Sequence, residues 1–193
     1  MKAADVISKG GVIAFRTDTF YGLGANPFAA NAVARVRELK GREDNKPILL
    51  LISDRDQVER LITTPSQNFA RAAEKFWPGP LTIIGTAVAA LAEGITAGTG
   101  TVGLRLPAGE DLRGFIRECG GVLTATSANP SGRDPACSAA EVAAYFPSGL
   151  DLIVDGGEVE VTEPSTVLDV LTSPPRIVRA GAIRRDDIEE LFS

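Results

Sequence analysis

The sequence contains no histidine and is poor in cysteine and aromatic residues. The absence of histidine excludes Ser–His and Cys–His catalytic triads, histidine-ligated zinc sites and imidazole acid–base chemistry. The two cysteines, Cys119 and Cys137, do not form a C-x-x-C pair, so we expect two free thiols in a reducing compartment rather than a disulfide. Aromatic residues make up only 6% of the chain, which leaves few platforms for stacking nucleic-acid bases.

The sequence also lacks a long hydrophobic run. The longest stretch without a charged residue, 76–92, is interrupted by prolines and glycines and is shorter than the roughly 20 apolar residues of a membrane-spanning helix. Near the N-terminus, Lys2, Asp5 and Lys9 stand where a signal peptide needs an apolar segment. We therefore expect a soluble, cytoplasmic protein that does not associate with membranes.

What the chain does contain is a globular composition. It has 193 residues, of which 44% are hydrophobic and 23% are charged, enough to bury a core. Twenty basic and twenty-five acidic residues give a net charge of −5, which argues against a general nucleic-acid-binding surface and leaves room for a local basic patch. We find no internal repeat, no low-complexity segment and no linker, so the sequence predicts a single domain over residues 1–193.

Short apolar segments typical of strands alternate with amphipathic segments typical of helices. The predicted strands are 11–17, 47–53, 81–86, 102–106, 122–127, 151–155, 165–170 and 176–179. The predicted helices are the N-terminal segment, 29–40, 54–62, 66–76, 111–119, 138–146 and 186–192, with Ser53 and Ser138 as N-caps of two of them. The last three strands follow one another without room for helical crossovers. The pattern therefore predicts an α/β fold with a twisted, open, mixed parallel and antiparallel sheet and flanking helices.

One motif is misleading. Residues 98–103 spell G-x-G-x-x-G, but the segment leads into a predicted strand instead of opening a helix. A dinucleotide-binding loop needs the helix, because its N-terminus holds the pyrophosphate. We interpret the segment as a loop, and the chain has no P-loop motif either.

Three polar segments follow or precede predicted strands. The first, 17–24, places two hydroxyls, a carboxylate and a phenol beside two glycines, and a turn stabilised by its own side chains explains it equally well. In the second, Lys40, Arg42 and Lys46 surround the end of a helix, where they suit a polyphosphate but also suit the helix dipole. The third, 123–132, ends a strand in hydroxyl and amide groups that a solvated turn would also explain.

Together with four further segments, these make seven motifs that follow one another over nearly the whole chain. They are T-D-T-x-Y-G-L-G at 17–24, K-x-R at 40–42, W-P-G-P-L-T at 77–82, R-x-P at 105–107, T-S-A-N-x-S-G at 126–132, S-T-V at 165–167 and R-x-G at 179–181. In this order the motifs resemble those of the YrdC/Sua5 family of threonylcarbamoyl-AMP synthases. The resemblance implies a YrdC-like fold. Because the chain ends soon after Arg179, it also implies the short bacterial form without a further C-terminal domain.

The resemblance implies an enzyme, a nucleotidyltransferase. Its reaction condenses L-threonine, bicarbonate or CO2, and ATP into L-threonylcarbamoyladenylate and diphosphate, which supplies the N6-threonylcarbamoyl modification of adenosine 37 in tRNA. This chemistry needs positioned substrates and stabilised negative charge rather than a histidine. The implied cofactor is Mg²⁺ bound mainly through ATP, with no metal site on the protein. The implied partners are the substrates, the downstream proteins of tRNA threonylcarbamoyl transfer, and weakly bound tRNA or double-stranded RNA.

The resemblance also implies residue roles. The family's catalytic tetrad falls on Lys40, Arg42, Ser127 and Asn129. The residues that match ATP contacts are Arg42, Lys46, Thr101, Ser127 and Arg179. Those that match L-threonine contacts are Thr19, Arg105 and Ser165, with Arg105 as the clamp for the carboxylate, and those expected to shape the pocket are Thr17, Asp18 and Tyr21.

Two positions depart from the family pattern. Many relatives have proline where this chain has Arg16, which implies a less rigid turn or an added charge, and histidine where it has Leu51, which implies that one threonine contact is lost or replaced. Two other functions stay open. One is an RNA-binding or ribosome-maturation factor of the same fold without catalysis. The other is a paralogue that adenylates a different carbamoyl or acyl substrate.

Overall fold

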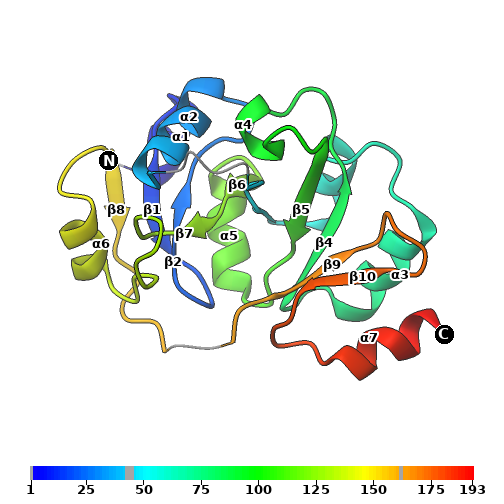
Figure 1. Ribbon diagram of the computed structural model, residues 1–193. Helices are drawn as coiled ribbons and strands as arrows, with labels where there is room; N and C mark the ends of the chain where they lie inside the picture. Colours follow the sequence, from blue (N-terminus) through cyan, green and yellow to red (C-terminus); the bar gives the residue numbers. More distant parts are fainter. Residues whose placement is uncertain (1, 42–45, 161–162) are drawn as a thin grey trace.

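A computed structural model describes residues 2–41, 46–160 and 163–193 (Figure 1). The helices are α1 (Ala3–Ser8), α2 (Ala30–Leu39), α3 (Gln67–Phe76), α4 (Glu93–Thr96), α5 (Glu110–Glu118), α6 (Ala139–Tyr145) and α7 (Arg185–Phe192), with a 3₁₀ helix η1 (Arg55–Arg60). The strands are β1 (Ile13–Arg16), β2 (Tyr21–Gly24), β3 (Leu50–Ile52), β4 (Leu81–Thr86), β5 (Thr101–Arg105), β6 (Val122–Thr124), β7 (Thr126–Ser127), β8 (Leu152–Val154), β9 (Thr166–Asp169) and β10 (Arg176–Arg179).

Within the described residues, the strands form two hydrogen-bonded sheets. The smaller has the order β7-β2-β1-β8 and the larger has the order β10-β9-β4-β5-β3-β6. Strand β1 is antiparallel to β2 and parallel to β8. In the larger sheet, β3–β5 and β4–β9 are parallel pairs, whereas β3–β6, β4–β5 and β9–β10 are antiparallel. The prediction of a mixed α/β fold with flanking helices is confirmed.

The two sheets are joined where a single strand was predicted, at 122–127. Strand β6 pairs with β3 in the larger sheet, and β7 pairs with β2 in the smaller one. Between them, Ala125 leaves both ladders, and its N–H donates to the Leu49 carbonyl at 2.9 Å. The segment therefore passes from one sheet to the other, from β6 to β7 (Figure 1). Ser127 is the second residue of β7 and pairs with Gly22 of β2.

Strand β2 was not predicted, because its residues were interpreted as part of a polar turn. Residues 17–20 are the turn of a hairpin that joins β1 to β2, and β2 itself is completely buried. Gly24 allows this burial, because a Cβ atom there would lie 2.8 Å from the ring of Phe15. The sequence analysis also missed the short helix α4.

The helix predicted at 54–62 is instead the 3₁₀ helix η1. Only Val58 of η1 is buried, so little apolar surface holds this segment against the core. Its N-cap is Asp54, without a side-chain hydrogen bond, so the predicted cap at Ser53 is wrong. The cap at Ser138 is confirmed, because its hydroxyl accepts a hydrogen bond from the Glu141 N–H at 3.2 Å.

The core has two parts. The larger cluster of buried side chains includes residues of α2, α3, β4 and β5, and Trp77 closes it by packing edge-on against Phe69 at 5.7 Å between ring centroids. The smaller cluster joins α1 and α5 to β1, with Phe15 stacked on Phe115 at 5.4 Å. Among the described residues, no helix combines the length and the hydrophobicity needed to cross a bilayer.

Candidate functional site

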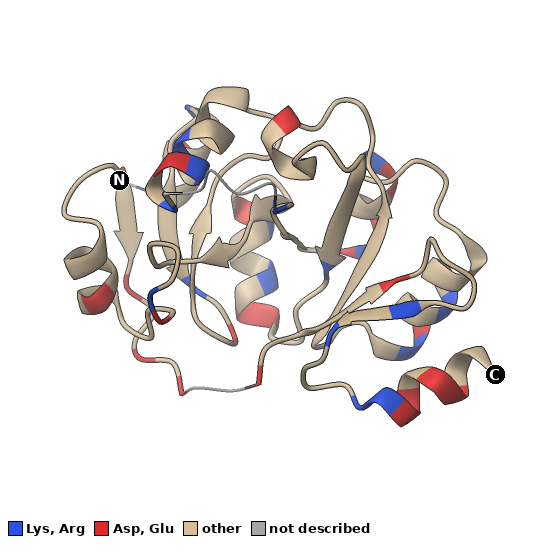
Figure 2. Cartoon of the chain, in the orientation of Figure 1, with Lys and Arg blue, Asp and Glu red and all other residues tan. Residues whose placement is uncertain are grey.

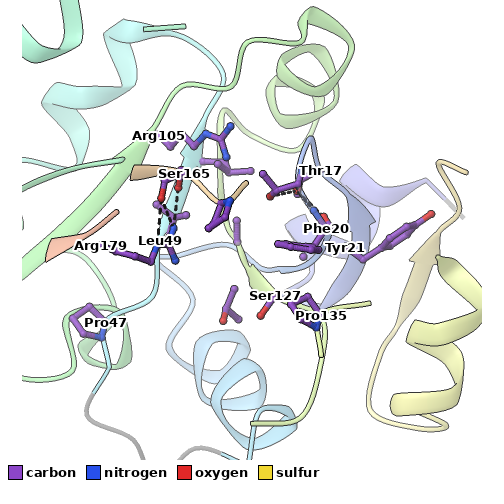
Figure 3. A pocket seen from close by; sticks show the side chains of 16 residues that line it. Thr17, Phe20, Tyr21, Pro47, Leu49, Arg105, Ser127, Pro135, Ser165 and Arg179 are labelled. Carbon is purple, nitrogen blue, oxygen red and sulfur yellow. Dashed lines mark hydrogen bonds between the residues drawn. The ribbon is translucent and has the colours of Figure 1, made fainter. Parts of the chain in front are cut away.

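A cavity of about 420 Å³ opens where the two sheets meet (Figure 3). Its walls come from the β1–β2 hairpin, the start of β3, the end of β5, the β6–β7 junction and the segments around Ser165 and Arg179. The predicted site residues that line it are Thr17, Thr19, Tyr21, Arg105, Ser127, Ser165 and Arg179. The other lining residues are Phe20, Gly22, Pro47, Leu49, Leu51, Ala125, Thr126, Pro135 and Pro164.

Arg105 is the last residue of β5 and is 4% exposed. Its Nε donates to the Gly79 carbonyl at 3.1 Å, and its Nη2 donates to Asp18 Oδ2 at 2.5 Å. Burial lowers the pKa of the guanidinium, the nearby Arg179 adds to this, and Asp18 opposes it. Because a guanidinium has five N–H donors, these two bonds orient Arg105 and leave further donors for a ligand in the cavity.

Arg179 is the last residue of β10, an edge strand of the larger sheet, and lines the same cavity. Its Nη2 donates to the Ser165 carbonyl at 2.8 Å and to Ser165 Oγ at 3.0 Å, and burial lowers the pKa of Arg179. Ser165 Oγ also lies 3.0 Å from Thr82 Oγ1, so this hydroxyl is held on two sides. The lining thus combines two arginines with several hydroxyls and has no acidic side chain among the described residues, which favours an anionic ligand.

The hairpin turn contributes hydroxyls to the opposite wall. Thr17 Oγ1 donates to the Phe20 carbonyl at 2.6 Å and accepts from the Thr19 and Phe20 N–H groups at 3.2 and 3.3 Å. Thr17 therefore stabilises the turn itself, as the simpler interpretation of this segment predicts. Thr19 Oγ1 lies 3.3 Å from Thr17 Oγ1 on the wall of the cavity.

Tyr21 lines the cavity with its ring and not with its hydroxyl. Figure 3 shows the phenol pointing away from the cavity. The hydroxyl donates to the Gly157 carbonyl at 2.9 Å and accepts from the Gly156 N–H at 3.1 Å, while Asp155 Oδ1 lies 3.4 Å away. Burial raises the pKa of Tyr21. The hydroxyl thus anchors the segment that follows β8.

Lys40, Ser127 and Asn129 are brought together at the end of α2. Lys40 Nζ donates to the Ser127 carbonyl at 2.7 Å, to Ser127 Oγ at 3.3 Å and to Asn129 Oδ1 at 3.0 Å. Lys40 is 2% exposed and Asn129 is 6% exposed. Of these three, only Ser127 lines the cavity. The fourth member of the predicted tetrad, Arg42, lies outside the described residues.

Asp18, Lys46 and Thr101 also stand outside the lining of the cavity. Thr101 begins β5 and shares a strand face with Arg105, about 13 Å away at the usual rise per strand residue. Gly103 lies between them and places no side chain on this face of the sheet. A Cβ atom at this position would lie 2.9 Å from Thr82 Cγ2. Lys46 lies four residues before β3, next to Pro47, which lines the cavity. The arrangement suits an elongated ligand that runs from Arg105 along β5.

Two residues that orient the site were not singled out from the sequence. The Gly79 carbonyl fixes Arg105, and the Thr82 hydroxyl fixes Ser165. Both lie in the segment 77–82, whose resemblance to the family motif was the available signal. Leu51 lies on the cavity wall and is 2% exposed, whereas Arg16 is not among the lining residues and donates to the Glu158 carbonyl at 3.3 Å.

The described residues contain no group of three His, Cys, Asp or Glu side chains that could hold a metal ion. The polar groups that line the cavity are hydroxyls and guanidiniums. This donor set fits a divalent cation that arrives with ligands of its own, such as phosphate oxygens and water, better than one held by a protein cage.

Comparisons with known proteins find related sequences and structures over most of the chain. The Sua5/YciO/YrdC family model, described as "Telomere recombination", matches residues 5–181. A threonylcarbamoyl-AMP synthase of Pyrococcus abyssi is 38% identical over 98% of this chain and 56% of its own length. One from Halorhodospira halophila is 34% identical over 86% of this chain and 87% of its own length. The crystal structure of P. abyssi Sua5 complexed with L-threonine has a TM-score of 0.91 at 38% identity, over 98% of this chain and 56% of that one. The chain thus spans about half the length of the P. abyssi relative.

Proposed function

The chain belongs to the Sua5/YciO/YrdC family, and on this premise we propose that it is a threonylcarbamoyl-AMP synthase. It condenses L-threonine, bicarbonate or CO2, and ATP into L-threonylcarbamoyladenylate and diphosphate. The observation that carries the proposal is the cavity at the junction of the two sheets, where two arginines meet hydroxyl groups without an acidic lining residue in the described chain. Such a surface suits the carboxylate, hydroxyl and phosphate groups of these substrates.

In this proposal, L-threonine binds at the Arg105 end of the cavity. The guanidinium, oriented by Gly79 and Asp18, holds the carboxylate of the amino acid in a bidentate pair. Thr19 and Ser165 offer hydroxyls on opposite walls for the polar groups of the substrate. Leu51 supplies an apolar wall that suits the methyl group. The complex of P. abyssi Sua5 with L-threonine, a structure similar over nearly the whole of this chain, supports L-threonine as the amino-acid substrate.

ATP binds along β5 and toward the smaller sheet. Arg179 and Ser127 contact its phosphates, Thr101 binds it at the far end of the β5 surface, and Lys46 is a further contact. Arg42, which the resemblance places in the same role, lies outside the described residues. Mg²⁺ enters with ATP, bound mainly through phosphate oxygens and water, and neutralises phosphate charge.

The reaction follows from holding the substrates close together. The ammonium group of threonine loses a proton to solvent, and the resulting amine forms a C–N bond with CO2 and releases a second proton to solvent to give a carbamate. A carbamate oxygen then attacks the α-phosphorus of ATP, and the bond to diphosphate breaks. Arg179 and the Ser127 hydroxyl stabilise the negative charge that builds on the phosphate, and no covalent enzyme intermediate is needed.

The product is an activated acyl phosphate that suits transfer to a nucleophile. We propose that it serves the N6-threonylcarbamoyl modification of adenosine 37 in tRNA, through separate transfer proteins in the cytoplasm. tRNA is then at most a weak ligand of this chain. Lysine and arginine are dispersed among acidic residues over the elements in Figure 2, as expected for a protein without an extended nucleic-acid-binding surface.

Diphosphate release tests the proposal. Purified protein with ATP, Mg²⁺, bicarbonate and L-threonine should release diphosphate, and omission of either bicarbonate or threonine should stop it. Release that continues without both would mean simple ATP hydrolysis and would contradict the proposal. The mass of the adenylate formed from a mixture of all amino acids separates this synthase from a paralogue with another substrate, and the complete absence of release would favour a non-catalytic RNA-binding factor.

A further inference from the structure

The ammonium group of Lys40 is already saturated by the protein. It has three N–H donors, and three acceptors of the described chain lie within hydrogen-bond distance: the Ser127 carbonyl at 2.7 Å, Asn129 Oδ1 at 3.0 Å and Ser127 Oγ at 3.3 Å. The side chain is almost completely buried, and Lys40 does not line the cavity. A lysine that binds a phosphate as a point charge would instead direct its ammonium at the ligand.

The backbone of Lys40 is tied to the same segment. Its carbonyl accepts a hydrogen bond from the Ser131 N–H at 2.9 Å. Asn129 extends the network, since its Nδ2 donates to the Pro130 carbonyl at 2.9 Å and to the Arg133 carbonyl at 2.7 Å. Lys40 therefore holds the segment 127–133 at two places, through its side chain and through its main chain. The first residue of this segment, Ser127, lines the cavity.

From these contacts we propose that Lys40 is a positioning residue. Its ammonium fixes the Ser127 hydroxyl and the segment 127–133 against the end of α2, and it does not itself bind the substrates. The role of Ser127 in catalysis rests on the proposed function, whereas the positioning of the segment rests on the contacts alone.

Energetics favour this arrangement over a mobile lysine. If the ammonium moved into the cavity to meet a phosphate, buried acceptors on Ser127 and Asn129 would lose their charged donor. Leaving such groups unpaired is unfavourable, and more so for hydrogen bonds to a charged group. The substrate would have to compensate for that loss before gaining any affinity. The same contacts explain why a lysine stands here, because a neutral or shorter side chain could not serve three acceptors at once.

Amide hydrogen exchange without substrates tests the positioning directly. The N–H groups of Asn129 and Arg133 donate within the segment, to the Ser127 carbonyl at 2.9 Å and the Pro130 carbonyl at 3.1 Å, and the Ser131 N–H donates to the Lys40 carbonyl at 2.9 Å. In Lys40→Met we expect exchange across 128–133 to rise by roughly tenfold or more, the ratio that corresponds to about 1.4 kcal/mol of lost local stability. The matched control is Lys75→Met, which removes an exposed lysine from the last turn of α3 and should leave this segment unchanged.

A double-mutant comparison tests whether Lys40 acts through Ser127. If it does, the diphosphate release rate of Lys40→Met/Ser127→Ala should lie within about threefold of the slower single variant. If Lys40 contacts phosphate independently, the two losses should multiply. Where Lys40→Met does not fold, Lys40→Gln, which keeps two N–H donors and loses the charge, takes its place under the same criteria.

Faster exchange in 128–133 together with non-multiplying losses supports the proposal. Unchanged exchange in a variant that loses turnover overturns it, and so do losses that multiply. A protein that releases no diphosphate at all contradicts the proposed function alone, because the exchange measurement requires no substrate and still decides whether Lys40 holds the segment.

Discussion

The two sides of the cavity use their cations in different ways. On the side of the smaller sheet, Lys40 gives three hydrogen bonds to Ser127 and Asn129 and does not line the cavity. On the side of the larger sheet, Arg105 and Arg179 each use part of their donors on the protein and line the cavity as well. A cation near a site is thus not necessarily a ligand of the substrate. The number of acceptors that the protein already provides decides which role it has.

The chemistry of the two side chains explains the difference. An ammonium has three donors and can be fully satisfied by a backbone carbonyl, a hydroxyl and an amide oxygen, as at Lys40. A guanidinium has five donors in a fixed plane, so two bonds to the protein fix its direction while others still face a ligand. An arginine can therefore be fixed by the protein and still offer N–H donors to a ligand.

The largest effect is expected at Arg105. Arg105→Met should lower kcat/KM for L-threonine by roughly 10²–10⁴-fold, because it removes two charge-assisted hydrogen bonds to the carboxylate, each worth about 1.5–3 kcal/mol. Diphosphate release measured at varied threonine concentration checks this result. Threonine kinetics that stay unchanged would show that Arg105 does not hold the carboxylate.

A second variant separates folding from binding at this position. Asp18 Oδ2 accepts from Arg105, so Arg105→Met removes the ion pair of a half-buried carboxylate with Arg105. Arg105→Met/Asp18→Asn should therefore resist urea better than Arg105→Met, while its use of threonine stays equally poor. Recovery of activity in the double variant would mean that the single variant was inactive because it was misfolded.

Arg179 should affect ATP more than threonine. Arg179→Met is expected to raise KM for ATP by roughly 10–100-fold, the value of one charge-assisted hydrogen bond to phosphate, with a smaller change in KM for threonine. The matched control is Arg176→Met on the same strand, whose side chain is 70% exposed and faces Asp169 at 3.7 Å. Arg176→Met should change KM for ATP by less than about twofold. Equal effects of the two variants would mean that Arg179 acts only through the general charge of the strand.

On the other side of the cavity, the expected effect is on stability. Asn129→Ala removes an acceptor of Lys40 and two donors to backbone carbonyls, so the free energy of unfolding should fall by roughly 1–3 kcal/mol. Ser127→Ala removes only the 3.3 Å contact with Lys40 and should lower it by less than about 1 kcal/mol. Urea unfolding of both variants compares the two losses of stability. Equal losses would contradict the division between a residue that holds the segment and one that faces the substrate.

Much of this fold was predictable because the spacing of apolar residues and the helix caps are local properties of the sequence. An amphipathic segment predicted α3, a short apolar segment predicted β4, and Ser138 caps its helix as expected. The sheet arrangement was not predictable in the same way. Whether 122–127 is one strand or two depends on Ala125 bonding to Leu49, and that partner is distant in the chain.

The site shows the same limit. Family resemblance named Lys40, Ser127 and Asn129 as one group, and the structure does bring them together. Residue type alone could not show that Lys40 is surrounded by protein acceptors, since a helix-end lysine is usually solvated. Nor could it show which end of Tyr21 meets the cavity, because this depends on the segment after β8 reaching the hydroxyl.

The smallest effect on turnover is expected at Tyr21, because its ring lines the cavity while its hydroxyl binds the segment after β8. Tyr21→Phe keeps the cavity wall, so diphosphate release should change by less than about threefold. It removes the contacts with Gly156 and Gly157, both exposed, where water can substitute, so unfolding should become easier by only about 0.5–1.5 kcal/mol. Burial raises the pKa of Tyr21 in the folded protein above its ordinary 10.0. Above about pH 10 the phenol therefore ionises first in the unfolded chain, and the free energy of unfolding falls. Tyr21→Phe should lack this contribution to the fall in stability at alkaline pH. Tyr145→Phe, on α6, is the control for removing a tyrosine hydroxyl elsewhere. A loss of turnover as large as that of Arg179→Met would show that the segment after β8, and not the ring, sets the shape of the cavity.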